Sequence, residues 1–139
     1  MTVPKDYSRS TEFLNELLLR VEEETLLQTR HQAYTCLQAV LTVFRRRLTP
    51  EQVLRFAQIL PPATASIFID GWTPGEYTAV WGTPAALADE VRRFRQDHNM
   101  VTDSTIVEVA RALRRTVGDA ELDRALAPLG PEAQAYWAV

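Results

Sequence analysis

Apolar side chains recur at spacings of three and four residues along most of this chain, which is the pattern of helices that bury one face. The first helix is predicted over residues 11–21, where the apolar stripe consists of Phe13, Leu14, Leu17, Leu18 and Val21. The second is predicted over residues 30–47, with a core face made of Ala33, Leu37, Val40, Leu41, Phe44 and Leu48. The acidic residues 22–24 are typical of a solvated helix end or face.

Threonine and proline mark where the next helices begin and end. The sequence Thr49-Pro50-Glu51-Gln52 predicts a helix N-terminus, because the threonine can cap it, proline is tolerated at the first position and glutamine can reach back. Pro61-Pro62 ends this helix, and a short helix is predicted from Pro62 to Ile69. Residues 70–83 are rich in glycine, proline and aromatic residues and show no steady period, so we predict a linker.

Similar signals for the starts and ends of helices recur after the linker. Thr83-Pro84 predicts the start of a helix that ends near Asp97, with Arg92, Arg93 and Arg95 facing outward, before a break near His98-Asn99. A helix from residue 102 or 103 is predicted from Ile106, Val109, Ala110, Leu113 and Val117. Gly118-Asp119 begins another helix, and Gly130-Pro131 begins a last one that ends at Tyr136-Trp137. Only residues 66–70 resemble a strand, and we assign them to a helix end.

A weak internal repeat relates the two parts of the chain. A shift of 69 residues aligns residues 33–68 with 102–137 without a gap. Val40 then meets Val109, Phe44 meets Leu113, Arg45-Arg46 meets Arg114-Arg115, and Phe68 meets Trp137. Both segments share the same order: an apolar helix face, a turn, a second apolar helix face, a proline and a terminal aromatic residue. This order predicts two similar helical subdomains. A half of about 60 residues has only a marginal core, so the halves should pack together.

The predicted fold is therefore an all-α helical bundle of two structurally similar helix-hairpin subdomains related by that repeat. Residues 1–10 are polar and are expected to be flexible. Residues 11–139 are expected to form a single compact domain, in which the repeat halves 11–69 and 84–137 are joined by the linker 70–83.

Three segments of this pattern resemble the bacterial DUF2267 family. They are Arg47-Leu48-Thr49-Pro50-Glu51, Leu60-Pro61 and Phe68-Ile69-Asp70-Gly71-Trp72-Thr73-Pro74. The resemblance spans residues 12–137 and is looser in the second half, where Gly118-Asp119 replaces Thr-Pro and Leu129-Gly130-Pro131 replaces Leu-Pro. It implies an all-helical domain and carries over no activity and no catalytic residues.

Composition narrows the class of protein. With 139 residues and 46% apolar content, the chain is long enough for one core. A single cysteine, Cys36, cannot form an internal disulfide, and no cysteine–histidine cluster has zinc spacing. Residues 1–12 lack the apolar core of a secretory signal, and no run is long enough to cross a membrane, so we expect a cytoplasmic protein with no membrane partner and no cofactor. A charge of −3 argues against general nucleic-acid binding.

The reactive side chains have structural explanations. Cys36 lies on the flank of an apolar stripe, where cysteine usually acts as a small hydrophobe, and His31 at i−5 points to another side of the helix. His31 and His98 are expected at helix ends, without ligand partners. Asp119 and Glu121 suit a helix start better than acid–base chemistry. Nothing in the sequence therefore favours an enzyme.

Two groups of residues are candidates for an interaction surface. Arg45, Arg46 and Arg47 are echoed in the second half by Arg111, Arg114 and Arg115, which could form one cationic patch for phosphate or an acidic partner. The alternative is that these arginines favour helix C-termini and cover apolar neighbours. The second group is the linker aromatics Trp72, Tyr77 and Trp81, which either face a partner or fold back onto the core.

These observations favour a non-catalytic protein–protein interaction or adaptor module. The first alternative is nucleic-acid or phosphate binding through the paired arginines. The second alternative is a carrier of a small apolar ligand, or an enzyme, with its site between the two halves. We expect a protein partner, and the oligomeric state does not follow from the sequence.

Overall fold

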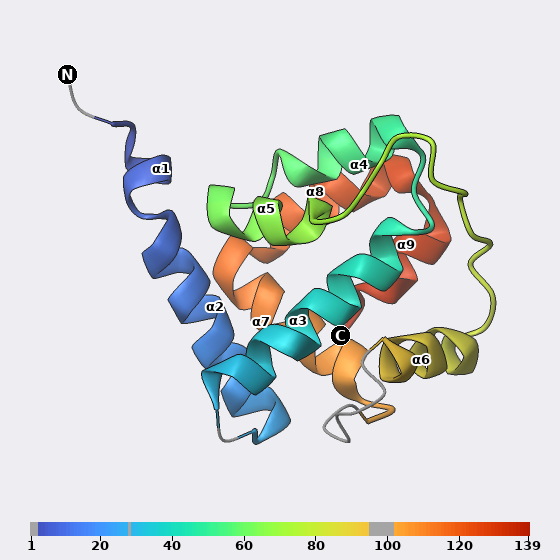
Figure 1. Ribbon diagram of the computed structural model, residues 1–139, viewed down its shortest axis with the longest axis horizontal. Coiled ribbons are helices and arrows are strands. Elements are labelled where there is room, and N and C mark those ends of the chain that lie inside the picture. The colour runs from blue at the N-terminus through green and yellow to red at the C-terminus, as the bar shows by residue number, and fades with distance from the viewer. Residues whose placement is uncertain (1–2, 28, 95–101) are drawn as a thin grey trace.

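The computed structural model describes residues 3–27, 29–94 and 102–139, and the regular structure within these ranges is helical (Figure 1). This confirms the predicted all-α class. In chain order the helices are α1 Lys5–Ser8, α2 Ser10–Thr25, α3 Arg30–Arg45, α4 Pro50–Ala57, α5 Pro62–Ile69, α6 Pro84–Arg93, α7 Thr105–Val117, α8 Asp119–Leu126, the 3-10 helix η1 Ala127–Leu129 and α9 Pro131–Tyr136.

Helix α3 runs through the middle of the molecule and packs against α2, α5, α6 and α7 (Figure 1). Its predicted core face is buried, but so are residues on its other sides, among them Thr35, Cys36, Thr42 and Arg45. A helix with neighbours on several sides needs apolar or satisfied side chains all round. The Thr35 hydroxyl meets this need by donating to the carbonyl of His31 at 3.1 Å.

Capping residues define the starts of α3 and α4. The predicted capping box of α4 is present: Thr49 accepts from the N–H of Gln52 at 3.3 Å, and the Gln52 side chain accepts from the N–H of Thr49 at 2.9 Å. A second, unpredicted capping box links Thr29 and Gln32 at the start of α3. Helix α3 ends at Arg45, two residues before the predicted end, because the chain tightens into i→i+3 hydrogen bonds there.

Helix α2 differs most from its prediction. It begins at Ser10 and continues through residues 22–24 to Thr25, because these glutamates form ion pairs with α3 and α7. The prediction that Phe13 belongs to the core is wrong: Phe13 is only partly buried and lies outside the core cluster. A short helix, α1, forms in the N-terminal segment and buries none of its residues. The predictions for Arg95, Asp97 and His98-Asn99 fall outside the described residues.

The centre of the core is aromatic. The ring centroid of Phe44 lies 4.9 Å from that of Phe56, 5.3 Å from Tyr136 and 5.4 Å from Trp137. These rings come from α3, α4 and the end of α9, so side chains from both predicted halves meet in one interior. The Tyr136 hydroxyl, buried in this cluster, donates to the carbonyl of Val40 at 2.7 Å.

Some helix bounds follow the shift of 69 residues, but α3 does not, since the shift carries it onto residues 99–114 whereas α7 spans Thr105–Val117. The shift carries α4, Pro50–Ala57, onto α8, Asp119–Leu126, and it carries the first residue of α5, Pro62, onto the first residue of α9, Pro131. One contact also corresponds: Arg45 donates to the carbonyl of Phe68 at 3.1 Å and Arg114 to that of Trp137 at 2.8 Å, each 23 residues further along. The internal repeat itself stays a prediction, which a superposition of the two backbones would test.

Candidate functional site

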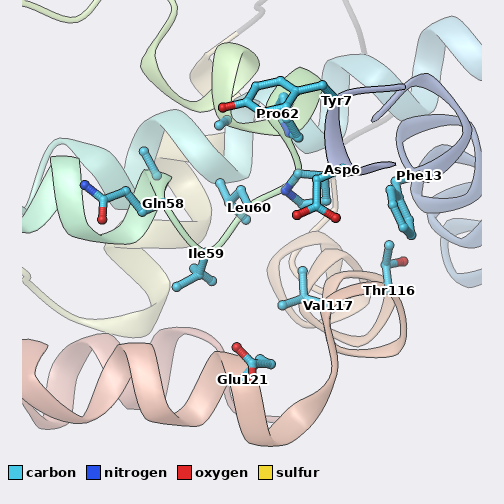
Figure 2. Close-up of a pocket in the computed structure, with 13 residues that line it drawn as sticks. Asp6, Tyr7, Phe13, Gln58, Ile59, Leu60, Pro62, Thr116, Val117 and Glu121 are labelled. Carbon is cyan, nitrogen blue, oxygen red and sulfur yellow. The ribbon is translucent and has the colours of Figure 1, made fainter. Parts of the chain in front are cut away.

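A groove of about 590 Å³ lies where three parts of the chain meet (Figure 2). One wall is α1 with the start of α2, the second is the turn between α4 and α5, and the third is the turn between α7 and α8. The last two turns belong to different predicted halves, so the groove lies between them. Its lining residues are Asp6, Tyr7, Phe13, Ala57, Gln58, Ile59, Leu60, Pro61, Pro62, Ala65, Thr116, Val117 and Glu121.

The two turns have local causes in the sequence. Pro61 and Pro62 end α4 and begin α5, because proline excludes the preceding residue from helical conformation and suits the first helical position. Between α7 and α8 the chain turns at Gly118, whose φ of 103° is a conformation that residues with a side chain rarely adopt. Loops are usually polar, but the first turn carries Ile59, Leu60 and two prolines and is therefore apolar.

The groove combines an apolar surface with oxygen acceptors. Its charged lining residues are Asp6 and Glu121, and no lysine, arginine or histidine lines it among the described residues. The Thr116 hydroxyl is already engaged, since it donates to the carbonyl of Ala112 at 2.9 Å and accepts from Arg20 at 3.1 Å. Gln58 is exposed and can both donate and accept. The chemistry suits binding of an apolar group flanked by hydrogen-bond donors.

The first arginine cluster holds the end of α3 against the linker. Arg45 is 4% exposed and donates to the carbonyls of Phe68 at 3.1 Å and Asp70 at 2.9 Å, and its guanidinium lies 3.7 Å from the Glu76 carboxylate. Burial lowers the pKa of Arg45, and Glu76 opposes this effect. The guanidinium of Arg45 therefore binds groups of the protein itself.

The other two members of this cluster share one carboxylate. Arg47 is buried and makes a bidentate pair with Glu90 of α6 at 2.5 and 2.8 Å, while its Nε donates to the carbonyl of Val80 at 3.2 Å. Arg46 lies 3.4 Å from the same Glu90 and sits over the ring of Phe94. Hydrogen bonds from Arg47 lower the pKa of the Glu90 carboxyl, against the raising effect of burial.

The second arginine cluster lies on α7 and pairs with different carboxylates. Arg114 binds Asp119 at 3.0 Å and Asp123 at 2.8 Å, and the hydrogen bond that it donates to Asp123 is the largest cause of its raised pKa. The more exposed Arg111 and Arg115 lie 3.7–3.9 Å from α2 carboxylates, namely Glu23 and Glu24. All six predicted arginines therefore have carboxylate neighbours, and the two clusters share none of them.

The three linker aromatics differ in how far they are buried. Trp72 and Trp81 are partly buried against the core, and the Trp81 ring centroid lies 5.9 Å from Phe44 and 6.0 Å from Tyr136. Tyr77 is 82% exposed. The second part of the linker is fixed by a hydrogen bond from the N–H of Ala79 to the carbonyl of Arg46 at 2.8 Å. Of these three side chains, Tyr77 alone is free to meet a partner directly.

A second, smaller cavity of about 340 Å³ lies between α6, α7 and α9. Trp81, Leu87 and Tyr136 contribute to its largely apolar lining. Helices α6 and α7 are joined by residues 95–101, which the structure does not describe. The groove of Figure 2, by contrast, is bounded entirely by described residues.

Other candidates from the sequence lie apart from the groove. Cys36 is buried in α3, and burial, with a smaller contribution from Glu108, raises the pKa of its thiol to about 11. His31 is exposed near the start of α3 and stacks on Tyr34. In the described part of the chain, no group of three or more histidine, cysteine or acidic side chains could hold a metal ion. The same residues include no helix long and apolar enough to cross a bilayer.

In the described residues the fold is all-helical, and it carries an open groove lined by both apolar and polar side chains. Residues 14–136 match the family described as uncharacterized conserved protein (DUF2267). Since the match covers most of the chain, the protein belongs to the DUF2267 family, as the sequence pattern indicated. No curated protein matches the chain.

Proposed function

We propose that the protein is a protein–protein interaction module and that a segment of its partner binds in the groove of Figure 2. The observation that supports this is a set of apolar side chains at the open groove: Phe13, Ile59 and the two prolines line it and are not among the fully buried core residues. A volume of about 590 Å³ is within the range of roughly 300–1,000 Å³ typical of small-molecule pockets, so the groove has room for an anchoring side chain. Apolar anchors of a partner segment would bury this surface and supply most of the binding free energy.

The arginine clusters support nucleic-acid binding less well. Binding a phosphate backbone depends on free cations that replace its counterions. Each predicted arginine instead has one or two carboxylates within 4 Å, and Arg45 and Arg47 are buried as well. The groove also supports catalysis less well than binding, because its lining contains no histidine or cysteine.

A library of random 12-residue peptides displayed on phage tests the proposal. After selection on the immobilised protein, the enriched peptides are measured against a variant with a blocked groove, Ala65→Trp. Ala65 lies on α5 and lines the groove, whereas Ser66, the next residue, is exposed and does not. We expect groove binders to bind Ala65→Trp at least tenfold more weakly and Ser66→Trp about as tightly as the unmodified protein.

A second variant covers the case in which Ala65→Trp perturbs the fold. Gln58→Trp changes an exposed side chain that lines the groove from the turn between α4 and α5, so it should leave the helical circular dichroism spectrum unchanged. It should also weaken the enriched peptides. Failure to enrich any peptide, or equal binding to both blocked variants and the unmodified protein, would overturn the proposal.

A further inference from the structure

We infer that the partner segment bound in the groove carries a lysine or arginine beside its apolar anchor. The inference rests on the proposed function and adds the chemistry of the partner to it. It follows from two independent properties of the groove: the charge of its lining side chains and the hydrogen-bonding state of its backbone.

The charged side chains of the groove are carboxylates from opposite walls. Asp6 comes from α1 and Glu121 from the first turn of α8, and Figure 2 shows them on different sides of the opening. Asp6 forms no ion pair with the described residues. Glu121 pairs with Arg124 at 2.9 Å, but both side chains are more than half exposed and Arg124 does not line the groove. Such an exposed pair is weak, so a cation from a partner can compete for Glu121.

The backbone of the turn between α4 and α5 offers acceptors without donors. The N–H groups of Gln58, Ile59 and Leu60 already donate to carbonyls of α4 at 3.2–3.3 Å, and Pro61 and Pro62 have no N–H. The carbonyls of residues 58–60 accept no hydrogen bond from the described residues. A partner group that meets this turn therefore gains hydrogen bonds only if it is a donor. Lysine and arginine are the side chains with several donors and no acceptor.

Both properties disfavour an acidic segment and a purely apolar one. An acidic side chain would face two carboxylates without a cation in the lining, and it would find no free N–H on the turn between α4 and α5. A purely apolar segment would offer no hydrogen-bond donor to the two carboxylates or to any carbonyl of the turn that it covers, which is unfavourable. An apolar residue next to a basic one satisfies both the apolar surface and the acceptors.

The phage library described above supplies the first test. Among peptides whose binding is lost in Ala65→Trp, we expect lysine and arginine to be at least twofold more frequent than in the unselected library, and aspartate and glutamate to be depleted. Groove-dependent peptides with an unselected charge composition would overturn this inference and leave the proposed function standing. A library without groove-dependent peptides would overturn both.

The second test removes the carboxylates while keeping their shape. For the tightest groove-dependent peptide, we expect Glu121→Gln to weaken binding about two- to fivefold, and the double variant Asp6→Asn with Glu121→Gln to weaken it about five- to twentyfold. Glu51→Gln is the matched control, because Glu51 also lies in a first turn, pairs with an arginine at 2.9 Å and is exposed, but it does not line the groove. Equal losses in the control and the double variant, or no loss in either, would overturn the inference.

Discussion

Replacing Glu90 by glutamine should destabilise the protein strongly, because Glu90 neutralises an arginine that the fold has buried. The Arg47 side chain is 6% exposed, and the Glu90 side chain is 27% exposed. The two form hydrogen bonds at 2.5 and 2.8 Å, which connect α6 to the end of α3. In Glu90→Gln one carboxylate oxygen becomes an NH₂ group that faces a guanidinium N–H, and the charge of Arg47 loses its counter-ion.

The expected loss can be bounded from this geometry. Removing one partner of a fully buried ion pair costs about 3–5 kcal/mol. Water reaches part of Glu90, and glutamine retains one acceptor oxygen, so we expect a loss of about 2–3 kcal/mol in the free energy of unfolding at pH 7. For a chain of this length the midpoint of thermal unfolding should fall by about 6–12 °C. Glu51→Gln, which removes an exposed ion pair of α4, should cost no more than about 0.5 kcal/mol.

The pH dependence of this stability difference tests whether the Glu90 carboxylate causes it. Arg47 lowers the pKa of Glu90 in the folded state, so the stabilisation from Glu90 is complete above its unfolded pKa, about 4.3, and is lost as the pH falls through the lower folded value. The difference between the unmodified protein and Glu90→Gln should therefore be constant from pH 7 to about 5.5 and shrink below about 4.3. Urea unfolding followed by circular dichroism measures it. A difference below 0.5 kcal/mol at pH 7, or one that does not shrink in acid, would refute this account.

Three further substitutions or probes test other parts of the fold. Tyr136→Phe removes the hydroxyl that donates to the carbonyl of Val40 at 2.7 Å, and it should cost about 1 kcal/mol in urea unfolding; no change would show that this bond contributes nothing net. Thr49→Ala removes the capping box with Gln52 and should cost about 1 kcal/mol, whereas Thr49→Ser, which keeps the hydroxyl, should stay within about 0.5 kcal/mol of the unmodified protein. Cys36 should react with a disulfide reagent at pH 8 at least a hundredfold more slowly in the folded protein than in urea, since the thiol is buried and its pKa is raised to about 11; equal rates would contradict its burial.

Local sequence signals predicted the helices well because each signal acts within a few residues. Thr49 and Pro50 define the start of α4 through bonds and conformations within one turn, and the prediction there is confirmed. Periodicity also identified the apolar faces, but it does not say what covers a face. Phe13 continues the apolar stripe of α2, yet it lines the groove because the helix extends beyond the core at that point. Helix α3 shows the opposite case, since its polar residues are buried by neighbours distant in sequence.

The surroundings of the candidate residues could not be predicted for the same reason. The shift of 69 residues pairs Arg45 with Arg114, but their hydrogen bonds reach carbonyls 23 residues away, which spacing alone does not reveal. One alternative placed a site between the two halves, but none of the residues that line the groove was predicted as a site residue, because its walls come from residues near 6, 60 and 118. One local signal was available. Loops are usually polar, and the apolar turn of Ile59, Leu60 and two prolines indicated a surface in contact with other parts of the structure or with a partner; the core buries Leu60, and Ile59 and the prolines line the groove.

The two ends of the linker differ in a way that is useful for engineering. Residues 79–81 are tied to the body by the Ala79 hydrogen bond, by the contact of Arg47 with Val80 and by the packing of Trp81. Gly75, Tyr77 and Thr78 are exposed, and Gly75 has open space around its Cα. A reporter peptide or an affinity handle inserted between Tyr77 and Thr78 would therefore project into solvent from the middle of the chain. The tethers that follow would keep the helices on either side in place.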